Sequence, residues 1–282
     1  MEKVYTTPWF YYEVYKTKNR TIHSPSKNLK KIQRIILNKY FKSFYDFDSA
    51  LEAASKHCNK KWLLKLDIKD FYNSITKDQI MQVIKSYVDE DNIESVYSMC
   101  TINNKLPTGA PTSPYIANLV LRSFDLDIKY ECIKFGISYS RYMDDLFFST
   151  DKQQFVLSLI ELSVLEKFKG LGFKINVDKI KYISSNKRQQ VLGLGVNNNK
   201  PVLTKEDKRK YRAYFYNLIS PLKFNNTQNY ESHEKEILGH LAYIKSVDTN
   251  YYKKMQFYIQ NLVKRLNIQK KPCLAKVLKV LK

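Results

Sequence analysis

The sequence has 282 residues, enough to bury a substantial hydrophobic core in one large domain or in two lobes. Lysine and arginine number 48 against 27 aspartate and glutamate residues, a formal net charge of +21. This charge predicts a polyanionic partner, with nucleic acid as the leading candidate and an anionic membrane surface as the alternative. No stretch approaches the roughly 18 apolar residues of a membrane-spanning helix, and the first residues lack the order of a signal peptide.

The cysteines are too widely spaced for a Cys-x-x-Cys zinc or redox pair. They are Cys58, Cys100, Cys132 and Cys273. We therefore expect plain thiols in a soluble, cytoplasmic protein.

The N-terminal segment predicts a β-hairpin followed by a helix. An aromatic, strand-prone run at residues 9–15 precedes the turn-like residues 18–20 and the strand-prone residues 21–22. From Ser26 onward, apolar side chains recur at helical spacing, and the remaining helix faces carry cations. Three of these cations are candidate nucleic-acid contacts, with a merely solvated helix face as the alternative: Lys27, Lys30 and Lys31.

The middle of the chain predicts two places where strands deliver acidic side chains. Residues 62–68 form a short apolar run that ends near Asp67, and residues 74–87 then favour a helix. Residues 141–148 favour a hairpin with Asp144 and Asp145 near its tip. Helical spacing returns at residues 161–169.

The last third changes character. Residues 190–203 favour a hairpin that turns at the asparagines 197–199. From Thr204, apolar residues keep a 3.6 period through three amphipathic helices. We expect one domain over residues 1–203 and a helical domain over residues 204–282.

Three aspartates are the strongest candidates for chemistry. In-line phosphoryl transfer through two divalent ions needs several carboxylates at one point, and Mg²⁺ prefers such oxygen ligands. Asp67 and the pair Asp144-Asp145 meet that need, because they lie at predicted strand ends with apolar flanks. An aspartate-rich turn with no metal is the plainer alternative.

Four motifs, in order along the chain, resemble those of reverse transcriptases. Residues 66–72, Leu-Asp-Ile-Lys-Asp-Phe-Tyr, resemble the first catalytic motif, and residues 141–145, Arg-Tyr-Met-Asp-Asp, look like the Tyr-x-Asp-Asp box. Residues 106–114, Leu-Pro-Thr-Gly-Ala-Pro-Thr-Ser-Pro, are similar to the template- and nucleotide-binding motif, and residues 172–179 look like the next one. The resemblance implies an α+β right-hand polymerase, with fingers and palm built from antiparallel sheet and helices and a C-terminal helical thumb.

The resemblance also implies roles for individual residues. Two Mg²⁺ ions, with Mn²⁺ as the alternative, would be bound by Asp67, Ile68, Asp144 and Asp145. Lys179 would protonate the departing pyrophosphate. Nucleotide binding would involve Arg20, Tyr72, Thr108 and Gly109, with Tyr72 excluding a 2′-hydroxyl. Each role has a plainer alternative: Tyr72 as core, Lys179 as a solvated lysine, and Arg20 as a salt-bridge residue.

The chain resembles retron reverse transcriptases in particular. Residues 20–26, Arg-Thr-Ile-His-Ser-Pro-Ser, and the Leu-Pro-x-Gly-Ala-Pro box resemble theirs, and the resemblance extends over nearly the whole chain. Departures are Ala53 at the start of an Asn-Ala-x-x-His motif, Leu192 in a Val-Thr-Gly motif, Met143 for the commoner alanine, and Thr108 where the family usually has glutamine.

The resemblance implies a structured noncoding RNA as template and primer, dNTPs as substrates, and RNA-linked single-stranded DNA (msDNA) used in antiphage defence. A separate effector protein would complete the system, and oligomers are allowed. The residues expected to contact RNA or DNA, besides the three N-terminal lysines, are His57, Leu192, Gly193, Lys208, Arg212, Lys253 and Lys254. Other functions remain open: a non-retron defence-associated or protein-primed reverse transcriptase, or a catalytically idle RNA-binding protein.

Overall fold

The computed structural model describes residues 2–7, 9–16, 21–44, 48–224, 230–268 and 274–280. The chain forms two compact units. The first unit comprises Met1–Ser49 and Lys60–Ser184, and the second comprises Ala50–Asn59 and Ser185–Lys282. The boundary between the two compact units therefore follows Ser184 and not Leu203. In addition, residues 50–59, which come early in the sequence, belong to the second unit. The expected domain boundary at residue 203 stays a prediction.

A three-stranded antiparallel sheet begins the first unit. Its strands lie in the order β1 (Glu2–Thr7), β2 (Phe10–Lys16) and β3 (Thr21–Pro25). The pairing of β2 with β3 confirms the predicted hairpin, while β1 was not predicted. Tyr12 is buried on the inner face, where it packs with Leu29.

Helix α1 (Lys27–Ile36) starts where the sequence predicts, because the Ser26 side chain accepts from the backbone N–H of Leu29 and caps the helix. A π-helical turn, η1 (Leu37–Phe41), and a 3₁₀ turn, η2 (Lys42–Phe44), extend it. Buried Gln33 on α1 donates to the Tyr12 hydroxyl at 2.6 Å and to the Met99 carbonyl at 2.8 Å. The first bond ties the helix to the N-terminal sheet, and the second ties it to the segment that contains Met99.

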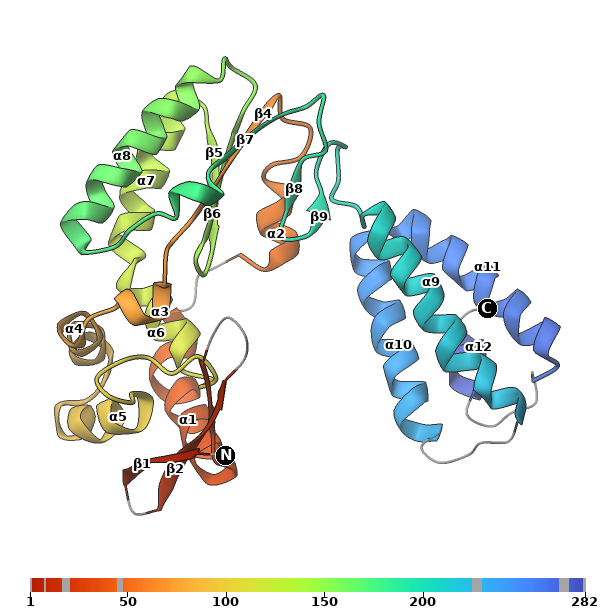
Figure 1. The fold of residues 1–282 in the computed structure, drawn as a ribbon, viewed down its shortest axis with the longest axis horizontal. Coiled ribbons are helices and arrows are strands. Elements are labelled where there is room, and N and C mark those ends of the chain that lie inside the picture. Colours follow the sequence, from red (N-terminus) through yellow and green to blue (C-terminus); the bar gives the residue numbers. More distant parts are fainter. Residues whose placement is uncertain are drawn as a thin grey trace. The chain divides into compact units, whose positions relative to one another are not determined.

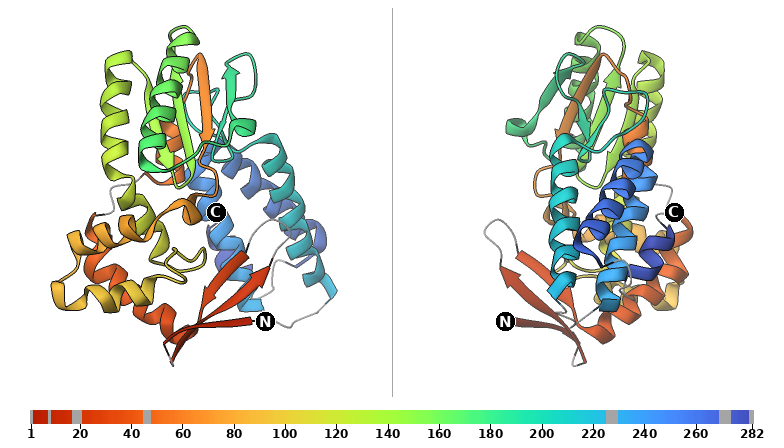
Figure 2. Two further views of the ribbon diagram at one scale, coloured as in Figure 1. Left: turned by 60° about the vertical axis from the view of Figure 1, so that its left-hand side comes forward. Right: turned by 90° about the vertical axis from the view of Figure 1, so that its right-hand side faces the viewer.

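The central sheet of the first unit has four antiparallel strands in the order β5-β6-β4-β7. They are β5 (Ser138–Tyr142), β6 (Asp145–Thr150), β4 (Trp62–Asp67) and β7 (Lys181–Ser184). The predicted strand ending at Asp67 and the predicted hairpin are both confirmed. Side chains alternate across the sheet, so Leu64, Leu66, Leu146 and Phe148 point into the core on the face that α7 and α8 cover (Figures 1 and 2).

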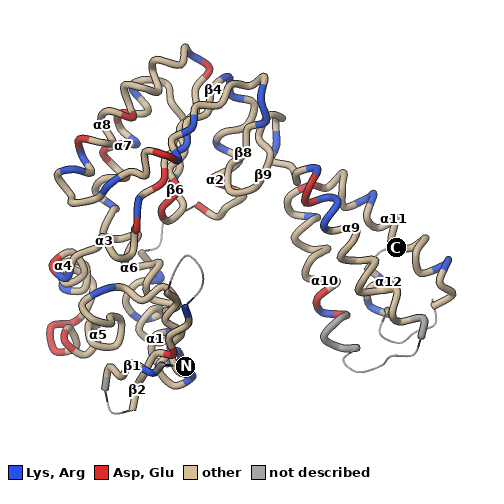
Figure 3. The backbone as a smooth tube through the Cα atoms, viewed as in Figure 1, with Lys and Arg blue, Asp and Glu red and all other residues tan. Residues whose placement is uncertain are grey.

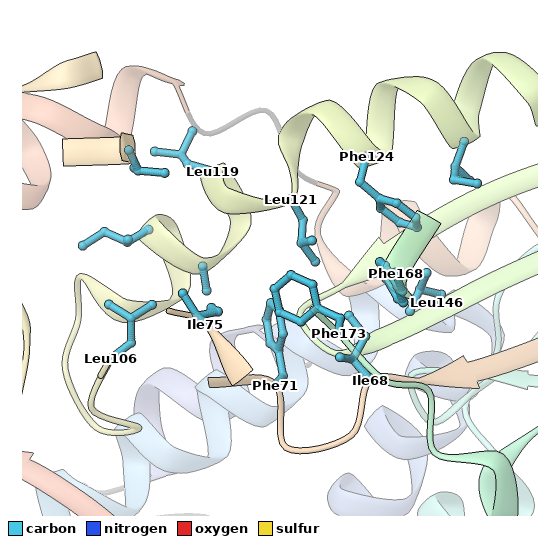
Figure 4. Close-up of a cluster of buried hydrophobic side chains, with 14 of the residues drawn as sticks. Ile68, Phe71, Ile75, Leu106, Leu119, Leu121, Phe124, Leu146, Phe168 and Phe173 are labelled. Atoms are coloured by element: carbon cyan, nitrogen blue, oxygen red, sulfur yellow. The ribbon is translucent and has the colours of Figure 1, made fainter. Parts of the chain in front are cut away.

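Helices surround this sheet. They are α3 (Phe71–Ser74), α4 (Lys77–Tyr87), η3 (Glu90–Asn92), α5 (Ile93–Cys100), α6 (Ser113–Val120), α7 (Arg122–Phe135), α8 (Phe155–Leu171) and η4 (Val177–Lys179). Helix α4 begins later than the expected Ser74, because Thr76 and Gln79 form a capping box there. Phe71, Phe168 and Phe173 meet in the core, with ring centroids 5.7–6.0 Å apart between neighbours (Figure 4).

The second unit contains the three helices predicted for the last third of the chain. Its elements are α2 (Ala50–Ser55), β8 (Gln190–Val191), β9 (Leu194–Gly195), α9 (Lys205–Ile219), η5 (Ser220–Phe224), α10 (Tyr230–Val247), α11 (Thr249–Leu266) and α12 (Ala275–Val280). Three of them, α9, α10 and α11, confirm the expected helices. No described helix combines the length and the apolar character that crossing a lipid bilayer requires.

The predicted hairpin at residues 190–203 turns earlier than expected. The tight turn lies at Leu192-Gly193, both with positive φ, and not at the asparagines. Paired positive φ values are typical of the type I′ turns that suit strand twist. The loop that follows returns the chain so that Gly195 and Val202 exchange backbone hydrogen bonds of 2.9 and 3.0 Å.

Candidate active site

Strand pairing brings the acidic strand ends together. In the β4–β6 register Asp67 lies directly opposite Asp145. Lys65 and Phe147 share their face of the sheet, opposite the apolar face that packs on α7 and α8. The carboxylates therefore lie on the side of the sheet that the core helices leave uncovered.

The β5–β6 turn consists of Met143 and Asp144. Met143 has a φ of 55°, a left-handed conformation that costs a non-glycine residue about 1 kcal/mol. The chain after β4 supports this turn, because the Ile68 N–H donates to the Asp144 carbonyl at 2.9 Å. Asp144 is thereby held beside the end of β4.

Buried Arg141 holds the turn from inside the first unit. Its guanidinium donates to both carboxylate oxygens of Asp125 on α7 at 2.8 and 2.5 Å, to the Asn118 side chain at 2.8 Å and to the Met143 carbonyl at 2.9 Å. Asp125 also accepts from the Tyr139 hydroxyl at 2.7 Å. The bidentate, charge-assisted contact with Asp125 and the hydrogen bond to Asn118 fix the turn relative to α7 and α6. In the sequence Arg141 stands out only as part of a motif, and nothing there indicates this positioning role.

Negative charge is concentrated at the strand ends. Burial, and then the charges of Asp144 and Asp67, raise the pKa of Asp145 to about 6, while Lys65 and Lys179 act in the opposite direction. Burial also lowers the pKa of Lys65, with Asp145 opposing and Lys181 reinforcing that change. Lys65 lies over the Phe147 ring at 5.4 Å. The place of Lys65 on this face was not anticipated from the sequence, where it only interrupts an apolar run.

Lys179 contacts Asp67 directly. Its ammonium donates to the Asp67 carboxylate at 2.8 Å. The Lys179 side chain is 58% exposed, whereas the Asp67 side chain is 15% exposed. The hydrogen bond to Asp67 raises the pKa of Lys179. The contact depends on the backbone of residues 174–179, since the Asn176 N–H donates to the Asp67 carbonyl at 2.8 Å. The structure thus brings Lys179 to the aspartates, as its assigned role requires.

The donor chemistry of this site fits a hard divalent cation. Carboxylates are the ligands that Mg²⁺ prefers, and the charges of Asp67 and Asp144 reach Asp145, while Ile68 could add only its backbone carbonyl. Within the described ranges, however, no three His, Cys, Asp or Glu side chains form a ready-made metal cluster. Lys179 contacts one of the two carboxylate oxygens of Asp67, Oδ1, at 2.8 Å.

The pKa of Asp145 predicts a pH dependence. Protonated Asp145 is neutral and cannot bind a cation, so Mn²⁺ affinity should fall by about tenfold per pH unit below pH 6. Because the folded pKa exceeds the ordinary 3.8, the metal-free protein should lose stability as pH rises from 3.8 to about 6. Mn²⁺ titrations and urea unfolding across this range measure both effects. An affinity that is flat between pH 5 and 7 would contradict the assignment.

Tyr72 is positioned by the short helix α3. Asp70 precedes this helix in a left-handed conformation and accepts from the Asn73 side chain at 2.7 Å. Phe71 is buried, and its ring lies 5.5 Å from the half-buried ring of Tyr72. The Tyr72 hydroxyl lies 3.9 Å from the Met143 sulfur. Tyr72 therefore stands beside the aspartate-bearing turn, and its sugar-selecting role stays a prediction.

The Thr108-Gly109 loop packs on strand β3. The Thr108 hydroxyl donates to the Thr21 carbonyl at 3.1 Å. A Cβ on Gly109 would lie 2.3 Å from the His23 carbonyl oxygen, so only glycine allows this approach. Arg20, expected to grip the triphosphate, lies outside the described residues. The nucleotide-binding role of this loop stays a prediction.

Gly109→Ala should disrupt this docking. We expect a loss of about 1–3 kcal/mol of stability, as for other overpacked sites, because the new methyl group meets backbone that cannot move aside freely. Gly170→Ala is the matched control, since a Cβ there has no neighbour within 4 Å. Urea unfolding of both variants gives the comparison. Equal stability of Gly109→Ala and the wild type would contradict the close approach.

The expected nucleic-acid contacts occupy different environments. Most are exposed, namely Lys27, Lys30 and Lys31 on α1, Arg212 on α9, Lys253 and Lys254 on α11, and Gly193 in the β8–β9 turn. Leu192 is half-buried in that turn, and Lys208 pairs with Asp248 at 2.7 Å. Their contacts with nucleic acid stay predictions.

His57 differs from the other expected RNA contacts because it has no exposed surface. It follows α2 in the second unit, and its backbone N–H donates to the Ala54 carbonyl at 3.1 Å. A buried imidazole cannot touch RNA in this conformation. Its expected part in RNA recognition is therefore limited to shaping the second unit.

The carboxylates and the lysine gathered here have the chemistry that phosphoryl transfer needs, and known proteins identify the family. Residues 13–198 match the family described as reverse transcriptase (RNA-dependent DNA polymerase). The chain belongs to this family and is an RNA-directed DNA polymerase of the retron type.

The retron assignment rests on three relatives from Escherichia coli. The chain is 32% identical to the retron Ec83 reverse transcriptase, over 86% of this chain and 88% of that protein. It is 31% identical to the retron Ec73 reverse transcriptase, over 84% and 81% of the two chains. It is 29% identical to the retron Ec86 reverse transcriptase, over 87% of this chain and 77% of that protein.

Two solved structures share the fold. Telomerase from Candida albicans, in complex with a TWJ fragment of telomeric RNA, has a TM-score of 0.53 and 10% identity, covering 96% of this chain and 65% of that one. Apo telomerase from Candida tropicalis, truncated from its C-terminal domain, has a TM-score of 0.50 and 12% identity. The match covers 68% of this chain and 54% of that one. The α+β polymerase fold expected from the sequence is confirmed.

Proposed function

We propose that this reverse transcriptase copies a cognate structured noncoding RNA and produces RNA-linked single-stranded DNA (msDNA) for antiphage defence in the cytoplasm. Its substrates are dNTPs, its template and primer are one RNA, and its partner is a separate effector protein. The observation that supports this proposal most is the 32% identity to the retron Ec83 reverse transcriptase across 88% of that protein. The basic character of the chain, with a net charge of +21, suits an RNA-bound state.

For catalysis, we propose that Asp67, Asp144 and Asp145 bind two divalent ions, with the Ile68 carbonyl as a further ligand. The chemistry supplied by such ions is stabilisation of charge at the attacking and leaving oxygens. Arg141 keeps Asp144 in place through the Met143 carbonyl. The raised pKa of Asp145, to which the charges of Asp144 and Asp67 contribute, supports this assignment.

We further propose that Lys179 moves between two partners. One partner is Asp67, whose carboxylate accepts a hydrogen bond from the Lys179 ammonium at 2.8 Å. With a divalent ion held at Asp67, the Lys179 ammonium would be free to donate its proton to the departing pyrophosphate. The 58% exposure of its side chain allows such a movement.

Tyr72 is the proposed barrier to ribonucleotides. Tyr72→Ala should reduce discrimination between dNTPs and rNTPs by about 10- to 200-fold, the range that small changes in a pocket wall produce. Tyr72→Phe keeps the ring and should keep the discrimination. Primer extension with each nucleotide type measures the ratio. Unchanged discrimination in Tyr72→Ala would assign the barrier to another residue.

Purification from the native locus tests the function itself. The co-purifying nucleic acid is divided, treated with RNase or DNase, and sequenced. A short single-stranded DNA joined to one abundant RNA supports the proposal. RNA alone, or DNA attached covalently to protein, would contradict it and indicate a different class of defence-associated reverse transcriptase.

A further inference from the structure

The helix layer of the first unit exposes an apolar surface. Six large apolar side chains on α7 and α8 are between 47% and 69% exposed. We call this set the outer face; it consists of Leu126, Tyr130 and Ile133 on α7 and of Phe155, Leu159 and Leu162 on α8. Large apolar groups gathered in this way on a water-facing surface indicate an interaction site.

The outer face is regular. On each helix the three residues follow at steps of four and three, which places them on one stripe. The opposite sides of the helices are buried against the sheet, through Ile128 and Cys132 on α7 and Ile160 and Val164 on α8. Both stripes therefore point away from the sheet.

The two stripes belong to one layer, because α7 and α8 pack directly on each other (Figure 2). The Ser163 hydroxyl donates to Glu131 at 2.6 Å, and Lys167 pairs with Glu131 at 3.1 Å. The rings of Phe124 and Phe168 lie 4.3 Å apart, centroid to centroid. These contacts run in opposite directions along the two helices, so the pair is antiparallel.

Charge distinguishes this layer from the rest of the chain. Helix α7 has three cations and three acids, and α8 has two of each, so the pair carries no net charge in a protein of net charge +21 (Figure 3). A surface for nucleic acid would be enriched in lysine and arginine. The outer face instead has the apolar centre and mixed charge of a protein interface.

We propose that the outer face binds a second copy of this chain across a two-fold axis. An antiparallel helix pair with 4–3 apolar stripes is self-complementary, since two such pairs form a four-helix bundle. Two-fold dimers are the commonest homo-oligomers. Local neutrality lowers the repulsion at the contact between two copies of a +21 protein, and salt screens the charges that lie farther from it.

The dimer leaves the active site accessible. Asp67 and Asp145 lie on the opposite face of the sheet from α7 and α8. Two copies joined through the outer face therefore present their carboxylates away from the interface. The proposal does not depend on the proposed msDNA function, because it concerns a different surface.

Sedimentation velocity of the full chain tests the proposal. Samples with bound RNA and after nuclease treatment are compared from about 1 to 100 μM, the range in which a micromolar dimer dissociates. We expect a species of twice 33.4 kDa in the nuclease-treated protein. Ile133→Glu combined with Leu162→Glu should shift the dissociation constant by at least about 100-fold, because charges would be buried at the interface.

Two further variants separate interface from folding. Ile35→Glu is the matched control, because Ile35 on α1 is 64% exposed but lies outside the outer face; it should leave the dimer intact. Leu126→Lys with Leu159→Lys should dissociate the dimer as the first pair does, with unchanged circular dichroism. A wild-type protein that stays monomeric at about 100 μM, the upper end of that range, or a dimer that survives both outer-face pairs, would overturn the proposal.

Discussion

Asp144→Asn is expected to reduce DNA synthesis by at least about 10³-fold while RNA binding persists. The variant keeps the size of the side chain and removes one negative charge from the point where Asp67 and Asp145 converge. Loss of one preorganised electrostatic group costs about 10²–10³-fold in other enzymes, and loss of a metal ligand should reach or exceed the upper value.

Primer extension and RNA binding, measured on the same preparation, check this prediction. Asp67→Asn should behave in the same way. Asp91→Asn, at an exposed position in η3, is the matched control and should retain full synthesis. Synthesis at the wild-type rate in both active-site variants would remove the aspartates from the mechanism.

Arg141→Met is expected to destabilise the first unit by about 3 kcal/mol, because it leaves the largely buried Asp125 carboxylate without its cationic partner. The side chains of Arg141 and Asp125 are only 1% and 18% exposed. Synthesis should also fall, since the Met143 carbonyl loses the donor that fixes the aspartate-bearing turn. Urea unfolding and primer extension measure the two losses.

The double variant Arg141→Met, Asp125→Asn separates these effects. A neutral amide at position 125 in place of the carboxylate removes the unpaired charge, so most of the stability should return. Synthesis should not return, because the turn still lacks its donor. If stability and synthesis recover together, Arg141 acts only through folding and has no part in positioning the turn.

The sequence predicts those parts of the site that depend on local pattern. Asp67 at the end of an apolar run and the hairpin around Asp144 were both foreseeable from strand periodicity. Ser26 likewise marked the start of α1. These features need only neighbouring residues for their definition.

Other parts depend on pairings between distant residues. The contacts of Arg141 with Asp125 and Asn118 join strand β5 to helices α7 and α6. No residue spacing in the sequence predicts these contacts. Strand β1 was missed because its pairing with β2, and not its composition, defines it. The position of the tight turn at Leu192-Gly193 does not follow from the sequence, because leucine is a rare residue at positive φ.

The association of residues 50–59 with the second unit also lay beyond local pattern. Helix α2 packs on β8, and the Asn59 N–H donates to the Val196 carbonyl at 2.8 Å. His57, which follows α2, is fully buried in this structure.

The most direct test of the central claim, that Asp67, Asp144 and Asp145 form the metal site of this reverse transcriptase, is a Mn²⁺ titration followed by electron paramagnetic resonance. The wild-type protein, with RNA and a dNTP bound, should take up two ions per chain at neutral pH. Asp67→Asn and Asp144→Asn should each lose at least one ion or bind it about 10- to 100-fold more weakly, while Asp91→Asn matches the wild type. Equal Mn²⁺ binding by all four proteins would contradict the claim.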